Sequence, residues 1–457
     1  MNKSASKHPT ALNLRKFLSN ELLLIGLAFV LYASNISWGG NRWKDIIETD
    51  GKGYYSYLPA VFIYHDLQCN FHDSIEKRYY NLSTYYDYRI NYDGVKVNKY
   101  FAGTAIAQLP FFLAAHVIAK FSHQPTDGFS APYQIAINLA AIFYVLAGLW
   151  FIKKWLLLEG TSASVVRWTI LLLAFGTPLF YYSVSEPAMS HAYSFFFVSA
   201  FCFFSRRYFQ EGYHGTDLLR LGFLTGMILI IRPVNGIVLL SVPFLAGSNI
   251  RLKAGIRSAW LHSASCISAI VVLLLIITIQ PTLYYLETGR WMIYTYGNES
   301  LRPLDAHILD FLLSYRKGFF VYTPLALISL WGLRKLSITN AWRSLTIALF
   351  LAAVVWLLSS WNVWWYGGSF SQRPMVEFLP FFAFLLSLSL LHQENQKLSI
   401  IKIFGVLAVV LCMFQTLQYR YYLIHWERMD KDHYWRVFLS TEGIKSGENP
   451  NKDLLIP

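Results

Sequence analysis

The chain consists of apolar runs separated by short polar segments. Twelve of these runs are candidate membrane spans, because an apolar helix satisfies all of its backbone hydrogen bonds internally inside the hydrocarbon core. The pattern therefore predicts a helical, multi-pass membrane protein. The runs are Leu18–Trp38, Phe101–Ala119, Tyr133–Ile152, Val166–Ser183, Tyr193–Phe204, Leu218–Ile231, Val234–Ala246, Ala259–Gln280, Gly318–Leu333, Ser344–Ser359, Met375–Leu391 and Ile400–Leu417.

One run, Phe101–Ala119, is predicted not to cross the membrane. If every run crossed, the basic loops that follow would lie opposite the basic N-terminus, against the preference of Lys and Arg for the cytoplasmic side. Removing this one crossing corrects all of the loops together, and the run contains Gln108, Pro110 and His116, which a lipid-exposed span tolerates poorly. We expect it to form a re-entrant or interfacial helix.

About eleven crossings follow, with a cytoplasmic N-terminus and an extracytoplasmic C-terminus. Residues 1–457 are interpreted as one polytopic membrane domain, since no repeat or soluble domain is evident. Residues 39–132 form a large first extracytoplasmic loop with interfacial helices, and residues 419–457 an extracytoplasmic tail. The fold class predicted is an all-α membrane protein in the cell (inner) membrane.

Composition supports this interpretation. The chain is 55% hydrophobic and only 14% charged, whereas soluble chains are nearer a quarter charged. The net charge of +13 comes without a basic run, so it reflects topology signals and not nucleic-acid binding. Three of the four cysteines lie in apolar spans, which excludes a disulfide framework or a thiolate metal cluster.

The first outer loop contains the first candidate site. It begins with Glu48 and Asp50, followed by Tyr54 and Tyr55. A carboxylate just outside the first span is a candidate general base. The alternative is a solvated loop with a tyrosine-rich surface helix, since Tyr is enriched at membrane interfaces.

A second outer segment brings Glu186 and His191 to the mouth of two spans. Ionisable groups at that depth cost free energy unless they are paired or hydrated. The functional interpretation is a substrate pocket. The alternative is a helix cap together with a histidine satisfied in the core.

The last outer loop combines Trp364, Gly367, Gly368 and Arg373. Its aromatics are typical of an interfacial belt, but a guanidinium at the membrane surface suits bidentate contact with a phosphate. Arg232, between two short spans, lies on the same face. Basic residues there run against the topology bias, and an anionic, membrane-embedded substrate would explain them.

Four short motifs make the chain resemble the GT-C superfamily of membrane glycosyltransferases, in particular protein O-mannosyltransferases and the lipid A aminoarabinose transferase. In that family an Asp-Glu-x-x-Tyr pattern follows the first helix, and Asp50 and Tyr54 match it. Gly51 stands at the second acid, so a paired carboxylate would be Glu48. Lys99 occupies the basic position at the end of the loop.

The other two motifs lie later in the chain. Glu186 or His191 stands where the family's second outer loop commonly has an Asp. The pattern Trp-x-x-Trp-x-x-Gly-Gly-x-x-x-x-Arg matches the late loop of many bacterial members, through Trp361, Trp364, Gly367, Gly368 and Arg373.

The resemblance implies a transferase that moves a sugar from a polyprenyl-phosphate donor to an acceptor hydroxyl of an unknown glycan, lipid or protein at the extracytoplasmic face. Asp50 would act as general base, and Arg373, Arg232 and Lys99 would bind the donor phosphate. No cofactor and no metal is expected, and the lipid bilayer is the partner surface. The alternatives are a multi-pass transporter or flippase and a non-catalytic envelope-assembly protein.

Overall fold

The computed structural model describes residues 20–81, 85–391 and 400–446. Helices dominate, and the strands are confined to one hairpin in the first outer segment. That segment contains η2 (Arg42–Asp45), α3 (Asp50–Pro59), η3 (Ala60–Tyr64), α4 (His72–Tyr79), β1 (Arg89–Tyr92), β2 (Val95–Asn98) and α5 (Gly103–Phe121).

The other helices form the bundle and the C-terminal segment. They are α2 (Glu21–Ala33), η1 (Ser34–Trp38), α6 (Ala131–Leu158), α7 (Ala163–Phe175), α8 (Leu179–Val184), α9 (Ser190–Gln210), α10 (Gly215–Ile231), η5 (Pro233–Ser241), α11 (Val242–Ala246), α12 (Asn249–Leu261), α13 (Ser263–Ile277), α14 (Ile279–Thr288), α15 (Ile308–Leu313), α16 (Phe319–Tyr322), α17 (Pro324–Ser329), α18 (Trp331–Thr339), α19 (Ala341–Ser359), η6 (Arg373–Phe378), α20 (Leu379–Leu391), α21 (Ile400–Arg420), α22 (Lys431–Val437) and α23 (Glu442–Ser446).

Among the described residues, seven helices are long and apolar enough to cross a membrane, or up to eight if a pair bent by 116° is one span. The prediction of an all-α membrane protein is therefore confirmed, whereas the count of eleven crossings is not. The seven are Glu21–Trp38, Gly103–Phe121, Ala131–Leu158, Ser263–Thr288, Ala341–Ser359, Arg373–Leu391 and Ile400–Arg420, and the bent pair is Pro233–Ala246 with Asn249–Leu261.

Several predicted spans are broken helices, which explains why length alone finds fewer of them. The span predicted at Val166–Ser183 is α7 followed by α8, and the break contains Pro178, whose ring cannot continue the preceding helix. The span predicted at Gly318–Leu333 is divided among α16, α17 and α18, with Pro324 opening α17. Proline is favoured at a first helical position because it has no N–H to leave unpaired.

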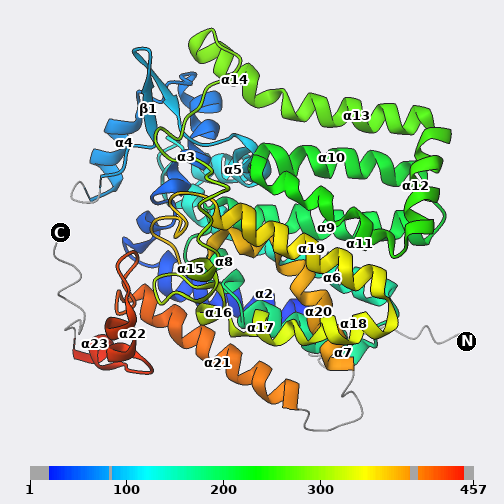
Figure 1. Ribbon diagram of the computed structural model, residues 1–457. Helices are drawn as coiled ribbons and strands as arrows, with labels where there is room; N and C mark the ends of the chain where they lie inside the picture. Colours follow the sequence, from blue (N-terminus) through cyan, green and yellow to red (C-terminus); the bar gives the residue numbers. More distant parts are fainter. Residues whose placement is uncertain (1–19, 82–84, 392–399, 447–457) are drawn as a thin grey trace, which may run out of the picture.

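The helix α5 contains the run that was predicted not to cross. It passes the length and hydropathy criteria for a span, so its non-crossing stays a prediction. Figure 1 shows α5 nearly end-on, whereas α10, α13 and α19 are seen lengthwise. Its first residue, Gly103, lies so close to α10 that a Cβ there would be 2.4 Å from the Ile230 carbonyl carbon. The close approach fixes the start of α5 against the outer end of α10.

The hairpin and α3 lie together at one end of the bundle, and α12 lies at the other (Figure 1). Strands β1 and β2 pair antiparallel, with Arg89 opposite Asn98. The Asn98 side chain donates to the Gly53 carbonyl oxygen (2.8 Å), which ties the hairpin to α3. The hairpin was not part of the sequence prediction, which expected only interfacial helices in this loop.

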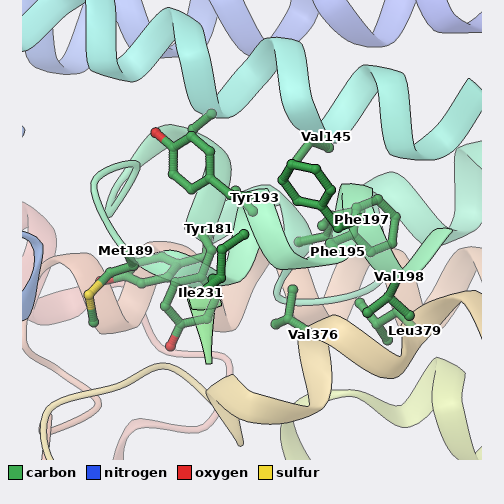
Figure 2. Packing of buried hydrophobic residues seen from close by; sticks show 14 of the residues in the cluster. Val145, Tyr181, Met189, Tyr193, Phe195, Phe197, Val198, Ile231, Val376 and Leu379 are labelled. Atoms are coloured by element: carbon green, nitrogen blue, oxygen red, sulfur yellow. The ribbon is translucent and has the colours of Figure 1, made fainter. Parts of the chain in front are cut away.

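The core is one large apolar cluster that joins the middle of the bundle to the outer segment. Figure 2 shows part of it, where side chains of α9 interlock with those of α6, η6 and α20. The labelled residues are Val145, Tyr181, Met189, Tyr193, Phe195, Phe197, Val198, Ile231, Val376 and Leu379. These contacts hold the outer ends of α9, α10 and η6 together, and the polar residues of the site extend from those ends.

Candidate functional site

Asp50 stands at the centre of a polar cluster at the end of the bundle that carries α3 and the hairpin. It is the first residue of α3, where the helix dipole favours a negative charge. Thr49 before it has φ 44°, a region that a β-branched residue adopts only under strain. Strained backbone of this kind persists where surrounding contacts fix it, and it is frequent at functional sites.

Three donors converge on the Asp50 carboxylate. Tyr100 and Tyr86 donate their O–H groups to Oδ1, at 2.6 Å and 3.1 Å. The Arg373 guanidinium lies 2.8 Å from Oδ2. The two phenol oxygens are themselves 2.6 Å apart, and the Tyr54 ring lies 4.6 Å from the Tyr100 ring. The carboxylate is therefore held by phenols on one side and by a guanidinium on the other.

This environment keeps Asp50 ionised. Burial alone would raise the pKa of Asp50, but Arg373, the Tyr100 hydrogen bond and Lys99 outweigh it and hold the pKa below its ordinary value. A carboxylate in this state is charged at neutral pH. It gains basicity only if its cationic partner moves away.

Arg373 reaches Asp50 because the loop before it turns sharply. Tyr366, Gly367 and Ser371 have positive φ values of 54°, 62° and 57°, so the chain reverses repeatedly before η6 begins at Arg373. The pair Arg373–Asp50 thus joins the last outer loop to the first. The sequence had suggested both residues, in different roles, and the structure brings them into direct contact.

Arg232 lies in the same region, at the break between α10 and η5. A residue before proline is disfavoured in the helical conformation, and Arg232 is extended, with φ −152° and ψ 108°. Its Nη1 lies 3.1 Å from Glu377 Oε1, and His191 Nδ1 lies 2.9 Å from the same oxygen. His191 therefore belongs to an ion-paired group instead of standing free in a pocket.

Lys99 approaches the cluster from the end of the hairpin. Its ammonium pairs with Glu299 (2.9 Å) and lies 5.0 Å from the centre of the Tyr296 ring. Tyr296 also lies within electrostatic reach of Arg232 and Arg373, whose charges partly offset the burial that raises the pKa of Tyr296. Three basic side chains from three distant outer segments therefore surround the same tyrosines.

Two further carboxyl groups lie beside this cluster. Glu186 accepts the Tyr181 O–H (2.8 Å), and burial together with Asp50 raises the pKa of Glu186 to about 7. Burial and the neighbouring Asp45 raise the pKa of Glu48 to about 8, although its side chain is solvent-accessible. Glu48 is not among the residues that contact Arg373.

Some suggested pocket residues lie elsewhere. Tyr55 is fully buried on the far face of α3, where its O–H donates to the Gly128 carbonyl oxygen. Trp364 lies against His307, with ring centres 6.0 Å apart. Gly368 lies near the Trp426 ring, which a Cβ would approach to 3.3 Å. Gly367 serves the turn before Arg373, as its positive φ indicates.

The sequence analysis missed five residues that make the cluster: Tyr86, Tyr100, Tyr296, Glu299 and Glu377. The tyrosines gave no signal because the chain has 30 of them, and an interfacial belt accounts for most. Glu377, an acid at the start of an apolar run, was the one detectable signal, since a buried charge requires a partner. Among the described residues, no group of three or more His, Cys, Asp or Glu side chains could hold a metal ion.

No protein-family model matches this chain, and no curated protein matches it either. Among solved structures, it is similar to the archaeal oligosaccharyltransferase AglB from Archaeoglobus fulgidus in complex with an inhibitory peptide and a dolichol-phosphate. The TM-score is 0.46 and the identity 10%, over 95% of this chain and 59% of that one. The apo form of the oligosaccharyltransferase from the same organism gives 0.45 and 11%, over 95% and 60%.

This chain spans about three fifths of the length of these structures. A likeness at this level leaves the activity, substrates and partners of the chain to be argued from its own residues.

Proposed function

We propose that this protein is a GT-C-type membrane glycosyltransferase that transfers a sugar from a polyprenyl phosphate to an acceptor hydroxyl at the extracytoplasmic face. The observation that carries the proposal is the convergence of one carboxylate, Asp50, with Arg373, Arg232 and Lys99 in a tyrosine-lined cluster. These groups come from four distant parts of the chain. The cations of such a cluster can stabilise an anionic leaving group, and its carboxylate can accept a proton.

In the proposed reaction, the acceptor oxygen attacks the anomeric carbon, and the bond from that carbon to the phosphate oxygen breaks. The acceptor proton passes to Asp50, and the lipid phosphate leaves with its added negative charge. Arg373, Arg232 and Lys99 offset that charge as it develops. Tyr86 and Tyr100 keep the carboxylate oriented through Oδ1, which leaves Oδ2 for the proton.

Donor binding and base activation are linked in this scheme. Arg373 lies 2.8 Å from Asp50 Oδ2 and lowers the pKa of Asp50. A phosphate offers this guanidinium a bidentate partner of higher charge. As Arg373 turns toward the phosphate, Oδ2 loses its partner and becomes more basic. Asp50 would therefore accept a proton most readily when the donor is in place.

Transfer by the purified full chain tests the proposal. The enzyme in proteoliposomes is supplied with a panel of polyprenyl-phosphate hexoses and pentoses and with envelope extracts as acceptors. Release of free polyprenyl phosphate together with a glycosylated product supports the proposal. Movement of intact donor between leaflets without release would identify a flippase and overturn it. If no donor is either cleaved or moved, the proposal is overturned and a non-catalytic protein is favoured.

A further inference from the structure

Within the Asp50 cluster, Arg232 forms a smaller polar group with Glu377 and His191. These residues come from η6, from the first turn of α9 and from the break after α10. Glu377 is fully buried, and His191 is 1% exposed. A buried carboxylate is retained only where partners offset the cost of removing it from water. The two partners here converge on a single oxygen, Glu377 Oε1.

Glu377, His191 and Arg232 lie within hydrogen-bonding distance of one another. His191 Nδ1 lies 2.9 Å from Glu377 Oε1. Arg232 Nη1 donates to the same oxygen at 3.1 Å and also lies 3.1 Å from His191 Nδ1. The Asn235 amide lies beside the same carboxylate and donates to Ser194 Oγ (2.8 Å).

The surroundings hold this group rigidly. Met189, Ile231 and Val376 stand next to or near its three members in the sequence, and all three are buried in the apolar cluster of Figure 2. The backbone positions of the carboxylate, the imidazole and the guanidinium are therefore set by core packing. A guanidinium anchored through one nitrogen keeps its remaining N–H groups aimed in a defined direction.

Arg232 lies close to the tyrosines of the candidate site. Arg232 is only partly buried, with 16% of its side chain exposed, whereas its partner Glu377 is not exposed at all. The charge of Arg232 partly offsets the burial that raises the pKa values of Tyr54, Tyr296 and Tyr366. Arg373 acts on the same three phenols. The two guanidinium groups, which have different anchors, thus lie near the same three tyrosines.

We propose that Glu377, with His191, is a positioning residue that holds Arg232 as a second, preorganised phosphate-binding cation of the site. This rests on the function proposed above. Arg373 is anchored by Asp50, the candidate base, whereas Arg232 is anchored by a carboxylate that takes no part in the chemistry. Arg373 can therefore move from Asp50 to the donor phosphate. Arg232 stays in place and fixes the position at which the phosphate binds.

A double-mutant cycle of Glu377→Gln and Arg232→Ala tests this, with undecaprenyl phosphate in detergent micelles as the probe. Each single change should weaken binding about 10- to 100-fold, equivalent to one charge-assisted hydrogen bond. The double variant should bind no more weakly than Arg232→Ala alone, because Glu377 acts through Arg232. Where transfer is measurable, donor KM should rise and kcat should fall, because Arg232 also offsets the charge that develops on the leaving phosphate. Glu287→Gln, a buried glutamate in α14, is the matched control and should bind as the wild type does.

If the double variant loses affinity by the product of the two single losses, the inference is overturned. Wild-type binding by Glu377→Gln would overturn it as well. If the Gln variant does not fold, Glu377→Asp takes its place. It keeps the charge but shortens the reach, so binding should fall between that of wild type and Arg232→Ala, and unchanged binding would count against the inference.

A second measurement separates this inference from the proposed function. Phenylglyoxal modification of Arg232, followed by mass spectrometry, should be slow in the wild type and several-fold faster in Glu377→Gln as the guanidinium is released. Failure of the wild type to bind the probe would overturn the proposed function. Equal modification rates in the two proteins would overturn the positioning role by itself.

Discussion

Two buried charge clusters stand at opposite ends of the bundle, and they differ in whether their charged groups remain accessible to a ligand. The cluster at the end near α12 centres on Glu159, which pairs with Arg206 and Arg343. Arg343 donates two hydrogen bonds, at 2.7 Å to Oε1 and 2.9 Å to Oε2, and the Trp155 indole donates a third. Arg206 also donates to the Leu245 carbonyl oxygen at the end of the bundle.

Glu159, Arg206 and Arg343 are each less than a tenth exposed. The side chains of Asp50, Arg373 and Arg232 are 16–17% exposed and lie among tyrosines. The first cluster joins helix ends that would otherwise separate, and it offers no face to a ligand. The second keeps its guanidinium groups accessible. Of the two, only the second cluster can therefore present a charged group to a ligand.

Asp50→Asn should produce the largest effect at the cluster of Asp50, Arg373 and Arg232, called the open cluster below. Asn keeps an oxygen for the phenol hydrogen bonds of Tyr86 and Tyr100 but cannot accept a proton at neutral pH. Turnover should fall about 10²- to 10⁴-fold, the usual contribution of general acid–base catalysis. Single-turnover transfer measures this directly.

Glu48→Gln is the control for that change, and it should cost less because Glu48 does not contact Arg373. Near-normal turnover in Asp50→Asn with a large loss in Glu48→Gln would move the base to Glu48. Normal turnover in both variants would remove general base catalysis from the proposal.

Glu159→Gln should have the next largest effect, on stability and not on catalysis. Neutralising this carboxylate leaves Arg206 and Arg343 buried side by side, and breaking such a pair costs about 3 to 5 kcal/mol. Thermal unfolding in detergent should show a marked loss. The exposed Glu211→Gln should stay within about 0.5 kcal/mol of the wild type. A variant with normal stability but poor transfer would contradict the purely structural role of this cluster.

The sequence alone identified both ends of the key contact but not the contact. Asp50 and Arg373 were detectable because each was predicted to stand at a membrane surface, where ionisable groups are costly. Their pairing depends on three-dimensional packing of the first and last outer loops, and a single sequence contains no information about that. The assigned roles, base and phosphate ligand, were therefore proposed without knowing that each residue restrains the other.

Local position misled the interpretation of two neighbouring tyrosines. Tyr54 and Tyr55 were both taken as pocket residues, yet neighbours on a helix point about 100° apart. Only Tyr54 lies against the cluster.

Arg373→Ala should weaken donor binding by about 1.5 to 3 kcal/mol, the range for a hydrogen bond to a charged group. Lys at this position should restore only part of the loss, because it lacks the planar fork. Isothermal titration with a polyprenyl phosphate measures both variants. Arg290→Ala, which removes an exposed pair with Asp93, is the matched control and should change affinity little. Unchanged affinity in both Arg373 variants would leave Arg373 as a structural partner of Asp50.

The smallest effect expected is a pH dependence of stability at the rim of the open cluster. Burial and Asp45 raise the pKa of Glu48 to about 8, above the ordinary value that the unfolded chain has. The folded state therefore binds more protons than the unfolded state between about pH 4.5 and 8, so stability declines as pH rises through this window.

Glu48→Gln removes that titration. Its melting temperature should exceed that of the wild type more at pH 8.5 than at pH 6, by a few degrees at most because water reaches the side chain. Glu159→Gln should show no such gain, since Glu159 is paired and ionised throughout the window. A gain that is equal at the two pH values would mean that Glu48 is charged in the folded protein at pH 6 and that the open cluster is more hydrated than its burial indicates.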